Sequence, residues 1–157
     1  MTQKFRILSI NISDKKGEQK RPVAQVELRV EHGIVGDAHA GPWHRQISLL
    51  ANEDITTMRG RGVELDFGDF AENITTEGVD LSCLPIGTRL FLGEAELEVT
   101  QIGKACHHGC AIYEVVGDCV MPRRGVFARV LRGGEVSSSS ECSVALPVAE
   151  PLHDRMA

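Results

Sequence analysis

The sequence predicts a mainly β fold, organised as a closed or nearly closed barrel with a few short helices. Three observations lead to this prediction. Short stretches in which apolar and polar residues alternate recur along the chain, glycine turns separate them, and residues 52–60 alone have clear helix signals. The 157 residues, of which 42% are hydrophobic and 25% charged, are enough for one domain with its own core. Neither disulfides nor a structural metal is therefore needed to hold the fold together.

The first half of the chain is expected to form four strands and one helix. The strands are expected at residues 8–12, 24–30, 46–50 and 73–76. The second of these has the clearest alternation, with Ala, Val and Leu on one face and Gln, Glu and Arg on the other. Residues 14–20 are expected to form a charged, solvated loop and residues 32–41 a glycine-rich loop. Asn52 can cap a helix whose first turn carries two acidic residues, and Gly60 lies near its end.

The second half is expected to add four more strands. They are expected at residues 90–92, 95–102, 126–131 and 143–148. Gly93-Glu94 joins the first two, which predicts a hairpin. Residues 133–134 are expected to turn and residues 137–140 to form a polar loop, whereas residues 106–113 can form one or two helical turns. We assign residues 1–146 to the domain and residues 147–157 to a flexible C-terminal tail.

The composition excludes several classes of protein. No apolar stretch approaches the roughly 18 residues of a membrane span, and the N-terminal residues show no secretion signal, so a cytoplasmic protein without membrane contact is expected. The net charge of −5 argues against nucleic acid as a partner. Residues 101–134 nevertheless hold five Lys or Arg against two Asp or Glu, a local net charge of +3. Such a positive region in an acidic protein suits a small anionic ligand.

Five cysteines, an odd number without a secretion signal, favour thiolate or metal chemistry over a disulfide framework. The most concentrated group is Lys104-Ala-Cys106-His107-His108-Gly-Cys110, directly after the predicted strand 95–102. The neighbouring Lys and His side chains favour the Cys106 thiolate, which is the reactive and metal-binding form. Cys83 and Cys142 stand among apolar neighbours and are expected to be core residues.

Two other uses of these cysteines stay open. Cys106, Cys110 and Cys119 with one histidine would supply the four ligands of a structural zinc ion, although their spacing is not a paired C-x-x-C pattern. A Cys106–Cys110 redox pair likewise lacks the C-x-x-C spacing of thioredoxin-like motifs.

A second group of polar residues lies in the glycine-bracketed segment 36–46. Its polar and aromatic members include Asp37, His39, Trp43, His44 and Arg45. The glycines let backbone amides approach a ligand closely. Arg45 can bind a phosphate or carboxylate through two hydrogen bonds, and Trp43 can flank a flat heterocycle. The alternative is a polar turn with one solvated arginine.

Two smaller groups complete the candidates. Glu72 and Asn73 offer an acceptor and an amide within residues 68–78, a pair that is uninformative by itself. Pro122-Arg123-Arg124-Gly125 is a basic turn, which is either an anion clamp or solvated surface.

Taken in this order, the segments resemble a MOSC domain, the family named after the C-terminal domain of molybdenum cofactor sulfurase. The resemblance runs from about residue 7 to about residue 144 and is greatest to the small stand-alone bacterial members. It rests on six segments: Gly33 to Gly41, His44 to Leu50, Phe70 to Gly78, Leu84 to Gly87, Leu97 to Cys106, and Gly125 to Gly134. The Gly-Asp turn that ends the domain in the family is replaced here by Ser139-Ser140-Glu141.

The resemblance implies a MOSC-type β-barrel, similar to the β-barrel of pyruvate kinase, and binding of the pyranopterin molybdenum cofactor. Cys106 matches the cysteine that ligates molybdenum in relatives that reduce N-hydroxylated compounds, which makes it the implied metal ligand and catalytic residue. The implied cofactor-binding residues are Asp37, His39, His44, Arg45, Glu72, Asn73, Lys104, Arg123, Arg124 and Arg129. Such side chains supply soft sulfur for the metal, cations for the phosphate and polar groups for the pterin edge.

Three functions are compatible with these residues. The first, which we favour, is carriage, maturation or sulfuration of the cofactor, with molybdopterin-biosynthesis proteins, a sulfur donor or molybdoenzymes as candidate partners. The second is a molybdenum-dependent reductase of N-hydroxylated compounds that receives electrons from partner carriers. The third is a zinc-bound structural or interaction module.

Overall fold

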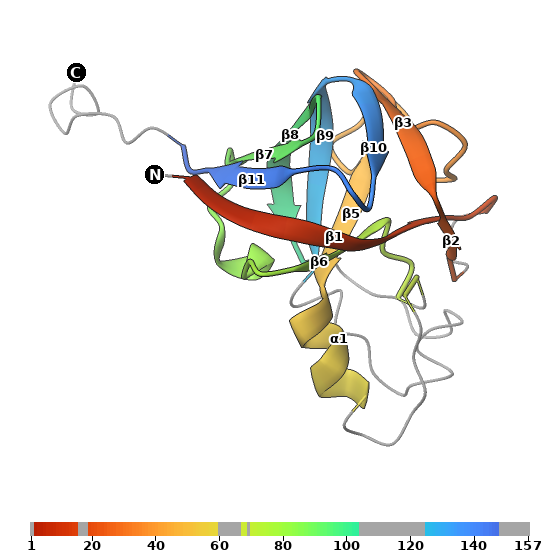
Figure 1. Cartoon of the computed structure of the whole chain (residues 1–157). Helices are drawn as coiled ribbons and strands as arrows, with labels where there is room; N and C mark the ends of the chain where they lie inside the picture. The colour runs from red at the N-terminus through yellow and green to blue at the C-terminus, as the bar shows by residue number, and fades with distance from the viewer. Residues whose placement is uncertain (1, 16–18, 60–66, 69, 104–124, 148–157) are drawn as a thin grey trace, which may run out of the picture.

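Seven strands close into a barrel in the computed structural model of the chain, which describes residues 2–15, 19–59, 67–68, 70–103 and 125–147 (Figure 1). Around the barrel the strands follow the order β1, β6, β5, β9, β8, β7 and β11, and β11 pairs with β1. Their bounds are Thr2–Ile12 (β1), Ile47–Ala51 (β5), Ile74–Glu77 (β6), Arg89–Leu92 (β7), Ala95–Ile102 (β8), Val126–Arg132 (β9) and Cys142–Ala145 (β11). The predicted β-barrel with few helices is therefore confirmed.

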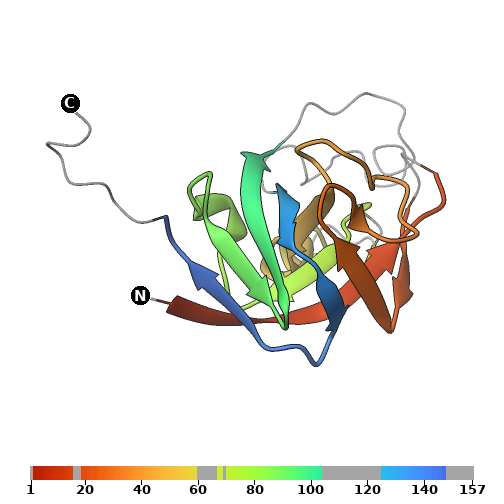
Figure 2. The same ribbon diagram turned by 90° about the horizontal axis from the view of Figure 1, so that it is seen from above.

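A smaller sheet and two short helices flank the barrel. The sheet has the order β10-β3-β4, and β2 pairs with the end of β1. The bounds are Arg21–Val23 (β2), Gln25–Arg29 (β3), Gly33–Ile34 (β4), Gly134–Ser137 (β10), Asn52–Arg59 (α1) and Leu81–Cys83 (a 3-10 helix, η1). Figure 1 shows α1 extending from the end of the barrel at which β5 ends, and Figure 2 shows the strands from above. Within the described residues, no helix is long and apolar enough to span a bilayer.

β1 joins the barrel to its flanking elements. Its residues 2–5 pair with β11, residues 6–10 with β6 and residues 10–12 with β2. The register with β6 shifts between Ile7 and Ser9, an irregularity of the kind that lets a strand bend around a barrel. β5 and β6 run parallel, so the chain between them must cross back along the barrel, and this crossover begins with α1.

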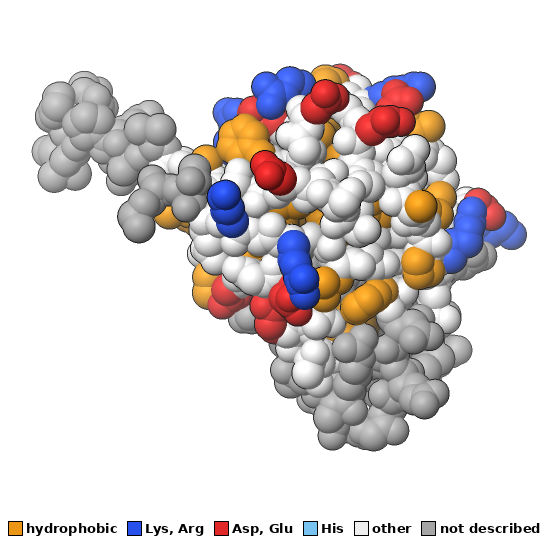
Figure 3. Space-filling model, in the orientation of Figure 1, with side chains coloured by type: hydrophobic (Ala, Val, Ile, Leu, Met, Phe, Trp, Pro, Cys, Tyr) orange, Lys and Arg blue, Asp and Glu red, His pale blue; other side chains and the backbone are white. Residues whose placement is uncertain are grey.

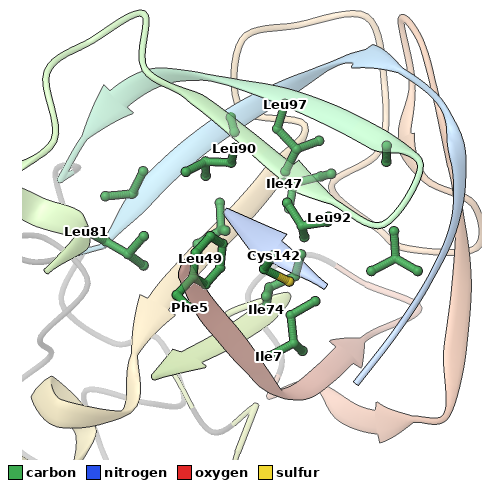
Figure 4. Packing of buried hydrophobic residues seen from close by; sticks show 14 of the residues in the cluster. Phe5, Ile7, Ile47, Leu49, Ile74, Leu81, Leu90, Leu92, Leu97 and Cys142 are labelled. Atoms are coloured by element: carbon green, nitrogen blue, oxygen red, sulfur yellow. The ribbon is translucent and has the colours of Figure 1, made fainter. Parts of the chain in front are cut away.

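Apolar side chains fill the interior of the barrel (Figure 4). On β8, Ala95, Leu97 and Val99 are buried, while the glutamates between them are partly exposed, as the alternation predicts. Figure 4 shows Leu90, Leu92 and Cys142 packed toward β5 residues across the interior. On the outside, Figure 3 shows Lys and Arg side chains interspersed with Asp and Glu on one face, a mixture typical of solvated surface.

The predicted elements agree with the structure except at a few places. The strand predicted at residues 24–30 is confirmed as β3. Two short strands were not predicted: β2, at residues 21–23, and β4, which lies within the loop predicted at residues 32–41. The prediction of a turn at residues 133–134 and a polar loop at residues 137–140 misses β10, whose pairing with β3 is a long-range contact without a local signal. The predicted helical turns at 106–113 and the tail from residue 148 lie outside the described residues.

Candidate functional site

Arg45 is the candidate residue whose surroundings are most unusual. It lies near the end of the loop between β4 and β5, and its guanidinium carbon lies 4.7 Å from the ring centre of Trp43 and 5.7 Å from that of Phe127. Trp43 is itself held by a hydrogen bond of 2.8 Å from Nε1 to the carbonyl oxygen of His39. The Arg45 Nε atom is buried, and no hydrogen-bond acceptor reaches it from the described residues. The two rings therefore contact a cation whose Nε–H has no acceptor among these residues.

The loop that carries Arg45 is attached to the end of β8. His44 Nε2 donates to Gln101 Oε1 at 2.8 Å, and the Gln101 amide donates to the Gly103 carbonyl oxygen at 2.7 Å. The hydroxyl of Thr100 also donates to the carbonyl oxygen of His44. These contacts place His44 and Arg45 beside the strand end from which the chain continues to Lys104.

Four predicted site residues, Lys104, Cys106, Arg123 and Arg124, lie outside the described residues. The two residues that flank this stretch are described and lie together, since the Gly103 amide donates to the Gly125 carbonyl oxygen at 2.6 Å. Gly103 and Gly125 therefore lie at one point of the barrel, where Gln101 links Gly103 to His44.

Asp37 and His39 belong to a buried polar cluster, the Lys20 cluster, which consists of Ser13, Lys20, Asp37 and His39. The Lys20 ammonium lies 2.7 Å from Asp37 Oδ1, 3.0 Å from Ser13 Oγ and 3.0 Å from His39 Nδ1. Neither the Lys20 nor the Asp37 side chain is accessible to solvent. Asp37 also accepts hydrogen bonds from the backbone amides of Ser13 and His39, both at 3.1 Å.

The pKa of Asp37 is lowered, so its hydrogen bonds and the charge of Lys20 together have a larger effect on this pKa than burial. Burial by itself raises the pKa of the carboxyl group, but the hydrogen bond and charge of Lys20, with smaller contributions from the Ser13 amide and Asn73, lower it below the ordinary value of 3.8. Asp37 is therefore ionised at neutral pH, and the structure brings it together with His39 and Asn73 among the predicted residues.

Glu72 is completely buried, and its carboxylate contacts protein groups. It accepts hydrogen bonds from the Gly68 amide at 2.9 Å, the Phe70 amide at 3.2 Å and the Thr75 hydroxyl at 2.7 Å. Burial raises the pKa of Glu72, and these three donors oppose the increase. The carboxylate thus holds the chain at Gly68 against the Lys20 backbone, where a Cβ on Gly68 would lie 2.2 Å from the Lys20 carbonyl oxygen.

Asn73 links three segments of the barrel. Its side-chain oxygen accepts from the Ser48 amide at 2.9 Å, and its amide group donates to the Asn11 carbonyl oxygen at 3.1 Å. Arg129 lies apart from both residues, because its guanidinium forms a 2.9 Å ion pair with Glu98 between neighbouring strands on the barrel exterior. In the described residues, the contacts of Asn73 and Arg129 are those of structural residues.

The two described cysteines differ in exposure. Cys142 is buried as predicted, and burial raises the pKa of its thiol to about 11. The prediction that Cys83 is a core residue is wrong, because it is exposed and its Sγ lies 3.1 Å from Asp80 Oδ2. Among the described residues, no three His, Cys, Asp or Glu side chains are close enough to hold a metal ion. Cys110 and Cys119 of the zinc alternative lie outside these residues.

Lys20 is the residue that the sequence reasoning missed. It is the last residue of a charged segment that was expected to be solvated, yet its side chain is fully buried. The local sequence holds no signal for this burial, because the partners of Lys20 are far along the chain and a lysine in a charged loop is ordinarily exposed.

Comparison with known protein families identifies one family that the chain matches. The model of the MOSC domain matches residues 36–142, more than half of the chain. The structure of the YuaD protein from Bacillus subtilis is similar, with a TM-score of 0.73, 22% identity, and coverage of 92% of this chain and 96% of that chain. YiiM from Geobacillus stearothermophilus has a TM-score of 0.69 and 21% identity, with coverage of 90% and 75%, and YiiM from Escherichia coli has 0.68 and 18%, with coverage of 94% and 72%. At these identities the likeness shows a shared fold. No functionally curated protein matches the sequence.

Proposed function

Because the chain belongs to the MOSC domain family, which is linked to the molybdenum cofactor, we propose that it binds the pyranopterin molybdenum cofactor through the Cys106 thiolate. We propose further that it serves in the carriage, maturation or sulfuration of that cofactor. The observation that carries the proposal is the guanidinium of Arg45 beside the strand end that leads to Cys106. This group contacts the rings of Trp43 and Phe127, and its buried Nε has no acceptor among the described residues.

The Arg45 guanidinium suits the phosphate of the cofactor. Burying a charged N–H group without an acceptor costs on the order of 1–3 kcal/mol or more. A bound phosphate would offset this cost, because its oxygens can accept two parallel hydrogen bonds from the fork of an arginine. The rings of Trp43 and Phe127 restrict the rotation of the guanidinium, so little conformational entropy is lost when the anion binds.

Cys106 is within reach of the same region by chain length. Consecutive Cα atoms are 3.8 Å apart, so the three-residue step from Gly103 to Cys106 spans at most about 11 Å. When bound, the cofactor supplies a thiophilic metal, for which a cysteine thiolate is a suitable ligand. Lys104, Arg123 and Arg124 remain predicted contacts to its anionic groups.

The other described candidate residues contact protein groups and support the site indirectly, by holding the segments around it in place. Asp37 and Lys20 fix the loop that carries Trp43 and Arg45, while Glu72 holds the chain that packs against Lys20. Carriage, maturation and sulfuration all require bound cofactor as their first step. The experiment therefore addresses binding before any of the three.

The test is purification of the chain from a host that makes the cofactor, followed by measurement of molybdenum and of pterin fluorescence. Arg45→Ala should weaken cofactor binding by roughly 10- to 150-fold, the value of one bidentate charged contact of about 1.5–3 kcal/mol. Arg45→Lys should restore part of the affinity, because a point charge cannot reproduce the fork. Cys106→Ala should lose molybdenum while the melting temperature stays nearly unchanged.

The matched control is Arg89→Ala, since this arginine pairs with Glu96 on the barrel exterior. It should bind the cofactor as the wild type does. Unchanged binding by Arg45→Ala would contradict the phosphate assignment. Stoichiometric molybdenum in Cys106→Ala would contradict the thiolate assignment, and zinc without pterin in the wild type would overturn the proposal.

A further inference from the structure

The outer face of β1, β11 and β7 carries a groove that the cofactor proposal does not use. Side chains alternate along a strand, so the neighbours of buried core residues point outward. By this alternation Lys4 (β1), Ser143 (β11) and Phe91 (β7) lie on the outside, and they form one row because Ser143 pairs with both of the others. β1 and β11 lie on the face that Figure 3 shows, where Lys and Arg side chains stand beside an area of backbone and small polar side chains.

Small residues in the middle of this row form the floor of the groove. The long side chains of Lys4 and Phe91 stand on either side of Ser143, and Gly93, at the end of β7, has no side chain. The turn at residues 138–140 lies at one end, since Ser140 Oγ is 3.3 Å from the position that a Cβ on Gly93 would take. The cavity has a volume of about 440 Å³, which is within the range of small-molecule sites.

Two opposite charges in the groove are not used by the fold. Lys4 and Glu141 both line it, and neither side chain forms an ion pair or a hydrogen bond with the described residues. Arg6 lines the groove as well, but its guanidinium is paired with Glu77 at 2.6 Å. The groove therefore offers one cation and one anion that a ligand can bind.

Hydroxyl groups and an aromatic ring line the same groove. The side chains of Ser138 and Ser143 form no hydrogen bond with the described residues, and Phe91 is half-buried, so part of its ring stays accessible. Ammonium and hydroxyl groups donate to a carboxylate, whereas a carboxylate accepts from an ammonium group. An aromatic ring packs against another ring or an apolar chain.

We propose that this groove is a second binding site, for a free amino acid with a large apolar side chain. The carboxylate of the ligand binds Lys4 and the Ser143 hydroxyl, its ammonium group binds Glu141, and its side chain packs on Phe91. A simple anion would face the Glu141 carboxylate, and a simple cation would face the Lys4 ammonium. A ligand that carries both charges avoids both repulsions.

The groove and the Arg45 region are separate. The groove adjoins the turn between β7 and β8, where β8 begins, whereas Gln101, which holds the loop of Arg45 through His44, lies near the other end of β8. A strand rises about 3.3 Å per residue, so the two ends of β8 are on the order of 20 Å apart. Amino-acid binding can therefore be tested on the cofactor-free chain, and its outcome does not depend on the proposed function.

The first test is a titration of the full chain with L-phenylalanine, followed by proton–nitrogen correlation NMR. We expect the signals of residues 138–143 to shift. Two analogues separate the charges, since 3-phenylpropionate lacks the amine and phenethylamine lacks the carboxylate. Each should bind roughly 2- to 5-fold more weakly, as for the loss of one exposed ion pair. Absence of shifts at residues 138–143, or equal affinity for L-phenylalanine and 3-phenylpropionate, would overturn the proposal.

The second test assigns each charge to its residue. Lys4→Ala should weaken binding of L-phenylalanine and 3-phenylpropionate but not of phenethylamine, and Glu141→Ala should weaken binding of L-phenylalanine and phenethylamine but not of 3-phenylpropionate. The same response of all three ligands to both variants would refute the assignment of the charges. The melting temperature of each variant should match that of the wild type, because both side chains are exposed.

The third test blocks the groove without removing a charge. Ser143→Leu places a larger side chain on the floor and should abolish binding of all three ligands. Arg29→Ala is the matched control, because this arginine pairs with Glu27 on the small sheet, and it should bind like the wild type. Undiminished binding by Ser143→Leu would show that the amino acid does not bind in this groove.

Discussion

Replacement of Asn73 by alanine tests whether this residue ties the barrel together. In the wild type the Asn73 side chain joins β5 to β1 from its position just before β6: its oxygen accepts from the Ser48 amide at 2.9 Å, and its amide donates to the Asn11 carbonyl oxygen at 3.1 Å. All three residues are buried. Asn73→Ala would leave one backbone N–H and one backbone carbonyl group buried without these partners.

The expected loss follows from these two groups. Each unsatisfied buried group costs about 1–3 kcal/mol, so the free energy of unfolding should fall by about 2–6 kcal/mol. The Ser48 hydroxyl, 3.2 Å from Asn73 Oδ1, adds little to this loss because the Ala71 carbonyl oxygen is also 3.2 Å away. A domain of this size loses roughly 2–4 °C of melting temperature per kcal/mol. A decrease of roughly 4–24 °C is therefore expected.

The assay is urea unfolding followed by circular dichroism, with thermal unfolding as a second measurement. Asn73→Asp is the informative companion, because it keeps an oxygen for Ser48 but puts a carboxylate oxygen opposite the Asn11 carbonyl. The decrease in the free energy of unfolding of Asn73→Asp should become smaller as the pH falls, since a protonated carboxyl group can donate to the Asn11 carbonyl oxygen. Arg45→Ala, in which no described hydrogen bond is broken, is the control. A loss below about 1 kcal/mol for Asn73→Ala would refute the reasoning.

Three further predictions concern other buried groups. The Thr76 hydroxyl is buried and has no hydrogen-bond partner in the described part of the chain, so Thr76→Val should raise the free energy of unfolding by about 1 kcal/mol, and a decrease in urea unfolding would contradict this. Burial raises the pKa of Glu72 above its ordinary value of 4.5, so the folded state binds more protons than the unfolded state above that pH. The stability of the wild type should therefore fall relative to Glu72→Gln as the pH rises from 4.5, and a constant difference would exclude this linkage. Alkylation of the folded protein at mildly alkaline pH, mapped by mass spectrometry, should modify the exposed Cys83 and spare Cys142, whose thiol has a pKa of about 11, so rapid labelling of Cys142 would show that this part of the barrel opens.

The local alternation of apolar and polar residues was sufficient to predict most strands of the barrel. The alternation in residues 95–102 predicts a strand with one buried face, and Ala95, Leu97 and Val99 lie on that face. The cap and acidic first turn predict the helix at Asn52–Arg59. Side-chain periodicity is a property of a few neighbouring residues, so it identifies an element and its buried face. It does not identify the partner strand, which is why β10 and its pairing with β3 were missed.

For the candidate site, the amino-acid sequence was sufficient to identify the family and its characteristic residue types. The ordered segments from Gly33 to Gly134 resemble a MOSC domain, and the family model matches residues 36–142. The contacts that the described side chains form could be known only from the folded chain. Asn73 forms its bonds with residues 25 and 62 positions away, and Lys20 is buried by Asp37, 17 positions away. Such distant partners determine whether a polar side chain is available to a ligand or is already hydrogen-bonded to other protein groups. A buried group must find a partner wherever the folded chain brings one, and local sequence does not specify where that is.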